Sequence, residues 1–364
     1  MGAMDDLLGP RQIAELCESL ERAAPDRGFD ALLETTALLG PLSLRARTDL
    51  AAHALVGIFP QYSAAAAAFR TALQDPAFSG WAIWPVTEAA VTLALTHGDS
   101  QAFDDCLDLL AELTPRLTSE FAIRRLLSAD LDRALARIQA WTADPDPHVR
   151  RLASEGTRPY LPWAVRVAGL TDRPDATVPI LDSLRSDPSD YVRRSVANHL
   201  NDLARHAPGM VLALASRWQE SGTPESAWII RRGLRTLVKK ANPDALALMG
   251  FRPADVAVEG PHSETVLLTL PAVLSFDCVL TNRSAAAARL AVDYVVHYVK
   301  ASGSTAPKVF KLAVLDLEPG ESRRLSGRHA FHQMTTRRHY AGLHHLELQV
   351  NGVRHGRLEF DVSL

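Results

Sequence analysis

This chain of 364 residues contains little cysteine and no long hydrophobic run. Its three cysteines, Cys17, Cys106 and Cys278, lie far apart and form no CxxC pair, which argues against a disulfide framework and against a thiolate metal site. No stretch reaches the roughly 18 apolar residues that a membrane-spanning helix requires. The first residues lack the basic and apolar regions of a signal peptide. We therefore expect a soluble protein in a reducing cytoplasm, without a membrane partner.

The common motifs of nucleotide, zinc and serine-hydrolase sites are missing as well. The chain has no GxxxxGK[ST], GxGxxG, HExxH or GxSxG pattern. Eight of its 13 histidines follow residue 252, but none stands at the helix or hairpin spacing of a metal site. We therefore expect no metal and no organic cofactor, and we favour a basic phosphate-contacting loop over a metal site in this region. The residues of that loop are Arg337, Arg338, His339, Tyr340 and His344.

The small net charge of −3 conceals a basic central segment. Residues 1–147 carry 11 Lys and Arg against 21 Asp and Glu, a balance of 11 − 21 = −10. Residues 148–252 carry 16 against 10, a balance of 16 − 10 = +6. A basic centre beside an acidic flank can hold a polyanion in one place and repel it elsewhere. The same asymmetry also arises by chance, so a nucleic-acid partner is one interpretation of it.

A short pattern, (V/I)RR, recurs along the chain and indicates stacked helix pairs. Its copies begin at Ile123, Val149, Val192 and Ile230. Each copy follows a helix-start signal: Ser119, Asp146 with Pro147, Ser189 or Asp190, and Thr223 with Pro224. Apolar-periodic segments before the copies predict partner helices. This pattern is typical of a HEAT-like α-solenoid, in which neighbouring pairs complete each other's core.

Near Pro253 the pattern changes from helical to strand-like. The expected strands are 265–270, 274–280, 290–299, 309–317, 322–330, 346–350 and 357–362. Their turns include Asn351-Gly352, a strong short hairpin signal. About seven strands in about a hundred residues predict an immunoglobulin-like β-sandwich. We therefore predict a multidomain α + β chain, with a HEAT-like α-solenoid at 1–252, a linker at 253–262 and an immunoglobulin-like β-sandwich at 263–364.

The repeated arginines are candidate phosphate ligands, because successive solenoid helices present them in similar positions on one surface. They are Arg150, Arg151, Arg193, Arg194, Arg231 and Arg232. The alternative is that they form intramolecular ion pairs with aspartates such as Asp144 and Asp187. The two interpretations remain open for each arginine.

An insert at residues 156–163 interrupts the repeat with the sequence GTRPYLPW. Its two prolines stiffen an extended path that carries Arg158, Tyr160 and Trp163, and arginine with aromatics on a rigid loop suits stacking and groove contacts with nucleic acid. The alternative is a packed loop in which Trp163 fills a gap in the core.

Three acidic residues come from three successive repeats: Glu120, Glu155 and Asp202. Glu155 lies just before the glycine that ends its helix, at the negative end of the helix dipole, where a carboxylate costs a few tenths to about 1 kcal/mol. Either the carboxylate is solvated or something cationic binds there. The three groups could meet in one cleft, but the register of the repeats does not force them to, and isolated surface carboxylates are the alternative.

Several blocks of the chain resemble AlkC-type DNA alkylation-repair glycosylases, a branch of the HEAT-like AlkC/AlkD superfamily. The segment HVRRLASEGTRPYLPWA (148–164) resembles the signature of that family. GWAIWPVTE (80–88), LTSEFAIRRLL (117–127) and YVRRSVANHLNDLARHAP (191–208) look like its other blocks, in the same order. The likeness covers about residues 80–250 well. The segment RRHYAGLHHLELQVNG (337–352) is similar to the immunoglobulin-like domain of one AlkC subgroup.

The resemblance implies a monofunctional DNA N-glycosylase that removes cationic methylated bases, such as 3-methyladenine and 3-methylcytosine, from double-stranded DNA without a cofactor. It also implies that the catalytic carboxylates are Glu120, Glu155 and Asp202, that DNA is bent without conventional base flipping, and that the 337–345 loop grips DNA. We further expect a cytoplasmic monomer that associates with the bacterial nucleoid when it acts on DNA.

One residue departs from the family pattern. Where the family usually has Arg-Pro-Arg-Leu-Pro-Trp, this chain has Tyr160 in place of the second arginine. A contact to the DNA backbone is therefore lost or exchanged for stacking. The competing hypotheses are a HEAT-repeat scaffold that binds DNA without catalysis and a scaffold for protein interactions.

Overall fold

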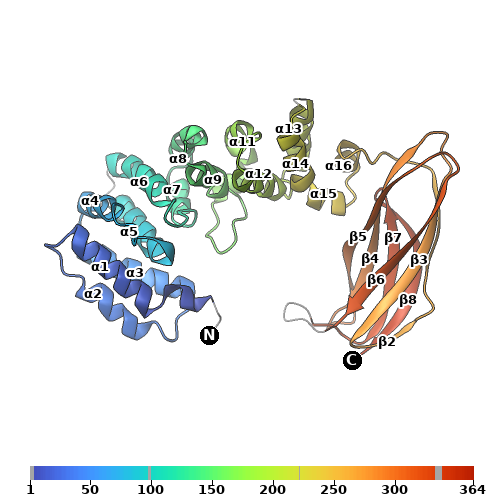
Figure 1. Ribbon diagram of the computed structural model, residues 1–364, viewed down its shortest axis with the longest axis horizontal. Helices are drawn as coiled ribbons and strands as arrows, with labels where there is room; N and C mark the ends of the chain where they lie inside the picture. The colour runs from blue at the N-terminus through green and yellow to red at the C-terminus, as the bar shows by residue number, and fades with distance from the viewer. Residues whose placement is uncertain (1–3, 97–99, 221, 333–337) are drawn as a thin grey trace. The chain divides into compact units, whose positions relative to one another are not determined.

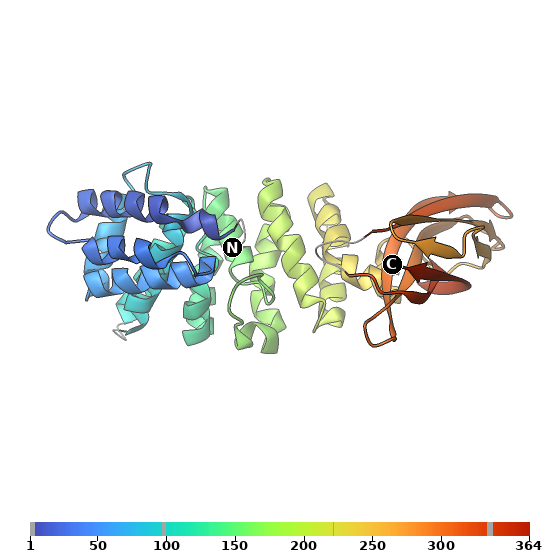
Figure 2. The ribbon, with the colours of Figure 1, turned by 90° about the horizontal axis from the view of Figure 1, so that it is seen from below.

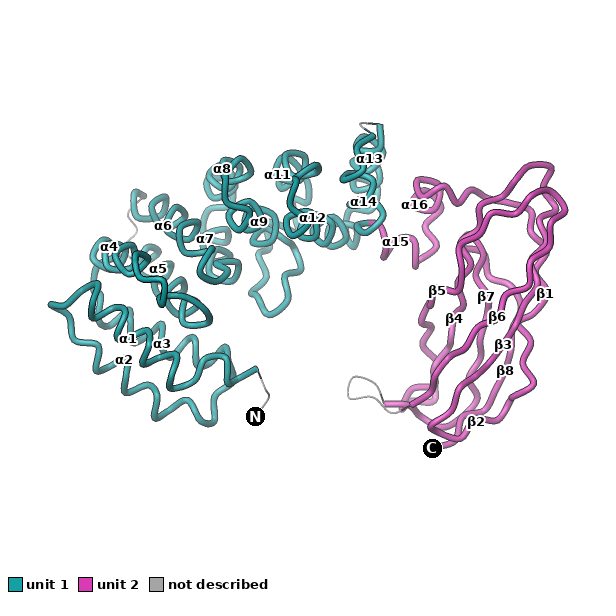
Figure 3. The backbone as a smooth tube through the Cα atoms, viewed as in Figure 1, with its two compact units in different colours: residues 1–233 teal, residues 234–364 magenta. Residues whose placement is uncertain are grey.

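The computed structural model describes residues 4–96, 100–220, 222–332 and 338–364. It divides into two compact units, Met1–Gly233 and Leu234–Leu364 (Figure 3). The boundary between the units thus follows Gly233, whereas the sequence predicted it after residue 252. Two short helices before residue 252 belong with the strands, because Ala241 and Leu246 approach the hairpin turn at Gly352 and the Asn351 side chain donates a hydrogen bond to the Arg252 carbonyl.

The first unit is helical throughout its described residues. Its helices are α1 (Pro10–Ala23), α2 (Asp30–Glu34), α3 (Leu44–Ile58), α4 (Tyr62–Ala72), α5 (Ile83–Thr96), α6 (Ser100–Leu113), α7 (Ile123–Ala129), α8 (Leu131–Ala140), α9 (Pro147–Glu155), α10 (Ala168–Asp172), α11 (Val178–Leu184), α12 (Asp190–Leu203), α13 (Pro208–Glu220) and α14 (Pro224–Gly233). None of the described helices combines the length and the apolar character that crossing a bilayer would need.

These helices form two layers, as the solenoid prediction requires. One layer contains α6, α8, α11 and α13, and the other contains α7, α9, α12 and α14 (Figure 1; Figure 2). Within the second layer α9 packs on α12, and α12 packs on α14. The insert after α9 projects from this second layer (Figure 1).

Two of the expected helix starts have the expected caps. The Asp146 carboxylate accepts a hydrogen bond from the His148 N–H at 2.7 Å, with Pro147 at the first helical position. Thr223 Oγ1 accepts one from the Ser226 N–H at 3.2 Å. Ser119 does not cap α7 with its side chain, because its hydroxyl donates to the Leu110 carbonyl instead.

Exposed ion pairs join successive helices of the α6–α13 layer. Arg133 on α8 contacts Asp104 on α6 at 2.8 Å, and Arg217 on α13 contacts Asp182 on α11 at 2.6 Å. Pairs this exposed contribute about 0–1 kcal/mol each. Substitutions in these exposed pairs therefore serve as controls for substitutions in buried ion pairs of the same unit.

The second unit begins with two helices and continues as a β-sandwich. Its elements are α15 (Arg235–Lys239), α16 (Pro243–Leu248), β1 (Val256–His262), β2 (Leu267–Thr269), β3 (Ala272–Asn282), β4 (Ala288–Val299), β5 (Thr305–Leu317), β6 (Ser322–Phe331), β7 (Gly342–Val350) and β8 (Val353–Ser363). One sheet has the order β1-β3-β6 and the other β2-β8-β7-β4-β5. Apolar side chains such as Phe276, Val296 and Leu346 fill the core between them.

The predicted hairpin at Asn351-Gly352 is confirmed. Val350 pairs with Val353 across the turn, and Asn351 and Gly352 both have positive φ, 43° and 88°. A two-residue turn with positive φ at both positions matches the twist of the strands that it joins.

The segment predicted as a linker at 253–262 contains strand β1, which is a correction. β1 pairs antiparallel with β3 from Val256 opposite Asn282 onward. The strand was missed because Gly260 and Pro261 signal a loop in the sequence, whereas in the structure they lie where the register of the pair shifts between Glu259 and His262.

Candidate active site

Glu155 is the last residue of α9, and its position depends on the glycine that follows. The N–H of Gly156 donates to the Leu152 carbonyl at 2.9 Å. A Cβ at Gly156 would lie 3.0 Å from both the Ile123 side chain and the Leu152 carbonyl, so any larger residue would push α9 away from α7. The close packing of the two helices therefore holds the Glu155 carboxylate at the end of α9, where it is only 6% exposed.

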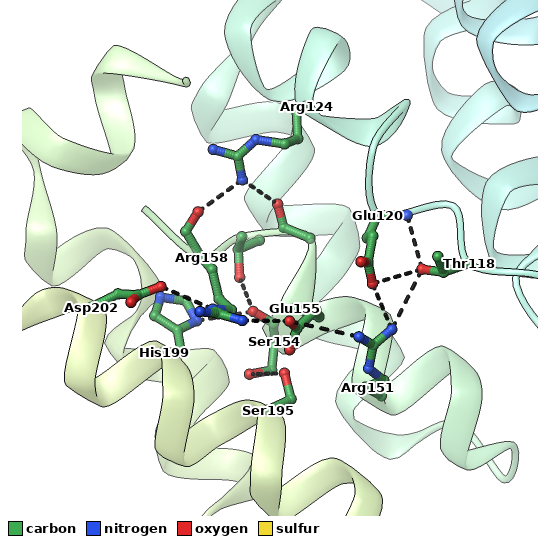
Figure 4. Close-up of polar contacts among 12 residues, drawn as sticks. Thr118, Glu120, Arg124, Arg151, Ser154, Glu155, Arg158, Ser195, His199 and Asp202 are labelled. Carbon is green, nitrogen blue, oxygen red and sulfur yellow. Dashed lines mark hydrogen bonds and ion pairs between the residues drawn. The ribbon is translucent and has the colours of Figure 1, made fainter. Parts of the chain in front are cut away.

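Two arginines connect the three candidate carboxylates into one buried cluster (Figure 4). Arg151 Nη1 lies 2.6 Å from Glu120 Oε2, and its Nη2 lies 3.6 Å from Glu155 Oε1. Arg158 Nη1 lies 2.5 Å from Glu155 Oε1, and its Nε lies 2.9 Å from Asp202 Oδ2. A third guanidinium, that of Arg205, lies 3.9 Å from Asp202 Oδ1, so the three carboxylates are matched by three arginines. The structure thus brings Glu155 together with Glu120 and Asp202, which lie 35 and 47 positions from it in the sequence.

The charge of Glu155 at the negative end of its helix is balanced by side chains of this chain. Arg158 and Arg151 supply the positive charge that offsets the negative end of the α9 dipole at Glu155. The alternative of a solvated carboxylate is wrong, because Glu155 is buried, and the cationic partners are these two arginines rather than a bound group.

Burial and charge act in opposite directions on this cluster. Burial raises the pKa of the Asp202 carboxyl above its usual value, and the nearby Arg158 guanidinium only partly opposes that rise. Burial alone would lower the pKa of Arg158, but the carboxylates of Glu155 and Asp202 more than offset it and keep the guanidinium charged. A carboxylate with a raised pKa is better suited to accept a proton at neutral pH.

Glu120 is fixed by its own loop before α7. Its Oε2 accepts a hydrogen bond from the Thr118 hydroxyl at 2.8 Å, while the Glu120 N–H donates to Thr118 Oγ1 at 3.1 Å. The reciprocal pair orients the carboxylate toward Arg151 (Figure 4).

A fully buried arginine, which sequence analysis did not single out, positions Arg158. Arg124 donates from Nη1 to the carbonyls of Gly156 at 3.0 Å and Arg158 at 2.8 Å, and from Nε to the Val165 carbonyl at 2.6 Å. It thereby joins both ends of the insert. Burial, with the charges of Arg166 and Arg158 adding to it, lowers the pKa of Arg124 to about 10. Its only sequence signal was membership of the first (V/I)RR copy.

A neutral histidine fixes α12 against α9. His199 donates from Nδ1 to the Ser154 carbonyl at 2.9 Å and accepts at Nε2 from the Thr177 hydroxyl at 3.1 Å. This tautomer is the one that a carbonyl acceptor requires. Complete burial lowers the pKa of His199 to about 3, so the ring stays neutral. Asp202 lies one turn further along α12, and Ser154 directly precedes Glu155, so this contact sets the distance between the two carboxylates.

Comparison with known proteins assigns the chain to a family. The chain is 31% identical over 368 residues to "Uncharacterized protein YhaZ" of Bacillus subtilis (strain 168), with 100% of both chains covered. Its structure matches Pseudomonas fluorescens alkylpurine DNA glycosylase AlkC bound to DNA containing an abasic site analog, with a TM-score of 0.88, 33% identity and 100% of both chains covered. The chain belongs to the AlkC and YhaZ family. Residues 257–364 also match the family described as "Uncharacterised protein YhaZ, C-terminal Ig-like domain". The predicted resemblance and fold class are thereby confirmed.

The insert at residues 156–163 exposes the side chain of Trp163. Trp163 is 64% exposed and has a φ of 62°, a left-handed conformation that a bulky residue rarely adopts. The alternative in which Trp163 fills a core gap is therefore wrong. An exposed aromatic ring on a strained backbone, a few residues from the carboxylate cluster, is typical of a ligand contact.

The Tyr160 ring is surrounded by two guanidinium groups and one imidazole. The Arg166 guanidinium lies 4.1 Å from the ring centroid and that of Arg205 lies 4.6 Å from it, while the His206 imidazole stacks on the ring at 5.2 Å. All three partners are exposed. Sequence analysis missed them because they lie outside the (V/I)RR pattern, although two belong to the block at 191–208.

The candidate phosphate ligands of the (V/I)RR copies differ from one another. Arg150 contacts Asp187 at 2.6 Å, and Arg193 donates to the carbonyls of Asp187 and Pro188, so intramolecular pairing is confirmed for these two. Arg151 lies inside the carboxylate cluster, together with Arg158 of the insert. Exposed positions are kept by Arg194, which also pairs with Asp190, and by Arg231 and Arg232.

The candidate loop in the second unit is only partly exposed. Arg337 lies outside the described residues. Arg338 is exposed beside the half-buried Tyr340 ring. His339 and His344, however, are 3% and 0% exposed, because both rings pack against Phe331 in the sandwich. Alternation along β7 turns His344 inward, so the expectation that the whole 337–345 segment faces a ligand is corrected.

Proposed function

We propose that this chain is a monofunctional DNA glycosylase that removes cationic N-alkylated bases from double-stranded DNA. Full-length likeness to the alkylpurine glycosylase AlkC supports DNA glycosylase activity and DNA as the partner. The observation that carries the finer proposal is the buried cluster of Glu120, Glu155 and Asp202, which Arg151 and Arg158 join. The proposed substrates are bases of the 3-methyladenine and 3-methylcytosine type.

The proposed reaction is hydrolysis of the bond between the base and C1′ of the sugar. As that bond breaks, its electron pair moves onto the cationic base, which departs neutral, and positive charge develops on the sugar. Water then adds to C1′ through its oxygen and loses a proton. Because the base is already a good leaving group, the enzyme mainly stabilises the oxocarbenium-like sugar and positions the water.

Each carboxylate has a proposed role that follows from its surroundings. Glu155, shared between two arginines, lies against the developing positive charge. Asp202, whose raised pKa suits proton acceptance, orients the water and takes its proton before releasing it to solvent. Glu120 adds a third carboxylate to the site and holds Arg151, which also contacts Glu155. Arg124 is a positioning residue, because it touches backbone carbonyls of the insert rather than the reacting atoms.

The test of this function is base release. Duplex DNA containing 3-methyladenine is incubated with the chain, and free base is separated by chromatography. We expect free 3-methyladenine, with strand breaks only after hot alkali, because the described cluster offers no amine nucleophile for a lyase step. DNA binding without any base release would favour the alternative, a non-catalytic scaffold, and salt-insensitive or absent DNA binding would favour a protein-interaction scaffold.

We propose that the cations around Tyr160 grip the DNA backbone next to the lesion, together with Trp163 and with Arg194, Arg231 and Arg232. Arg338 and Tyr340 of the second unit are proposed separately as DNA contacts. In this chain the tyrosine would replace a direct arginine contact by holding Arg166 and Arg205 in place. The double change Arg166→Gln and Arg205→Gln should weaken binding of any duplex and reduce the slope of log K against log salt by about 2, one unit per lost phosphate contact.

The control for this change is Arg217→Gln, an exposed arginine that pairs with Asp182 in the other helix layer. It should leave both the affinity and the salt slope unchanged. An unaltered salt slope in the double variant would show that the Tyr160 cluster does not contact phosphate.

A further inference from the structure

Three side chains with metal-ligating atoms converge on the outer face of the five-stranded sheet. His297 on β4 stands directly opposite His345 on the antiparallel strand β7, and Glu347 follows two residues later on β7. Their strand neighbours Val296 and Leu346 belong to the sandwich core. Because side chains alternate along a strand, the two histidines and the glutamate share the face that points away from the core.

The three groups are close enough to bind one ion together. One ligand atom from each of His297, His345 and Glu347 lies within 4.8 Å of the others, and all three residues are partly buried. His297 Nε2 lies 2.7 Å from Glu347 Oε2, and the two imidazole rings stack with centroids 3.8 Å apart. A tetrahedral ion with ligand bonds of about 2.1 Å separates its ligands by roughly 3.4 Å, so small side-chain rotations would complete the set.

A histidine–glutamate hydrogen bond alone does not account for this arrangement. It provides a partner for His297, whereas within the part of the chain that the structure describes the His345 nitrogens have no protein hydrogen-bond partner. The neutral imidazole is the form that ligates metals. Glu347 contributes the negative charge that a divalent ion requires.

We propose that His297, His345 and Glu347 bind a divalent ion of the Zn²⁺ class. Two imidazoles and one carboxylate are borderline ligands that suit Zn²⁺, with the fourth position left to water. Arg354, which contacts Glu347 Oε2 at 3.3 Å, competes for the same carboxylate and turns toward solvent when the ion binds. The ion would cross-link β4 to β7, adjacent strands within the sheet order β2-β8-β7-β4-β5, independently of base release.

The sequence did not reveal this site because its ligands have no motif spacing. His297 and His345 are 48 residues apart, and only the antiparallel register of β4 and β7 makes them neighbours. The pattern His-x-Glu at 345–347 places two ligands on one face of a strand, but it is a weak signal without the third.

The test is Zn²⁺ binding to the tag-free, chelator-treated full chain, measured by competition with a chromophoric chelator. We expect one equivalent to bind and to raise the unfolding temperature. His345→Ala and Glu347→Gln should each weaken binding at least about 100-fold, because even outer-shell partners of a metal are worth 10–100-fold in affinity. The matched control is His262→Ala, an exposed histidine of the same unit, which should bind as the wild type does.

A second measurement keeps the result interpretable if a variant folds poorly. Co²⁺ bound to the wild-type chain should give the visible absorption bands of a tetrahedral site, and these should disappear on adding one equivalent of Zn²⁺. Absence of these bands, or Zn²⁺ affinity that both His345→Ala and Glu347→Gln leave unchanged, would overturn the proposal.

Discussion

Glu155→Gln is expected to lower the rate of base release by at least about 100-fold, while affinity for duplex DNA stays the same or rises. Glutamine keeps the shape of the side chain but removes the charge that would face the oxocarbenium-like sugar. Removing one preorganised electrostatic group of this kind costs about 10²–10³ in rate. Removing an acidic charge beside the DNA cannot weaken phosphate contacts. The measurement is single-turnover release of 3-methyladenine, with DNA affinity determined in parallel.

The control for this prediction is Glu112→Gln, which removes a glutamate that pairs with Arg70 on exposed surface, away from the cluster. It should release base at the wild-type rate. The unfolding temperature of both variants shows whether the fold is intact. A folded Glu155→Gln protein that retains wild-type release would remove Glu155 from the proposed mechanism.

Arg158→Met should destabilise the helical unit by about 3–5 kcal/mol, the cost of leaving buried charges without their partner. Arg158 contacts Glu155 at 2.5 Å and Asp202 at 2.9 Å, and all three side chains are at least nine-tenths buried. Methionine fills similar volume but leaves Glu155 and Asp202 with only their longer ion pairs, to Arg151 at 3.6 Å and to Arg205 at 3.9 Å. The free energy of unfolding is measured by denaturant titration, and base release should be lost as well.

Two further variants separate this structural role from a direct contact with DNA. Arg217→Met removes an exposed ion pair and should cost no more than about 1 kcal/mol. Arg158→Lys keeps the charge but cannot bridge two carboxylates as the guanidinium does, so its stability should be intermediate. If Arg158→Met left stability unchanged but reduced the salt slope of DNA binding by about 1, Arg158 would contact the DNA backbone directly rather than hold the carboxylates.

The candidate site could be predicted in its residues but not in its organisation. Resemblance pointed to Glu120, Glu155 and Asp202, whereas the register of the repeats left open whether they meet. The structure shows them joined through Arg151 and Arg158. Both arginines had been expected to face DNA. A guanidinium can serve a phosphate or a carboxylate equally well, so only its neighbours in space decide which it contacts.

By itself the sequence determined the features that depend on a few neighbouring residues. Asp146 with Pro147 starts α9, Asn351-Gly352 turns the last hairpin, and strand alternation marks the sandwich. These follow from backbone hydrogen bonds and allowed φ values, which act locally. The tertiary structure decided what depends on contacts between distant segments: the burial of Arg158, the exposure of Trp163, the pairing of β1 with β3 and the meeting of His297 with His345. Their physical reason is packing, because the stacking of helices and the register of strands bring together residues that are far apart in the sequence.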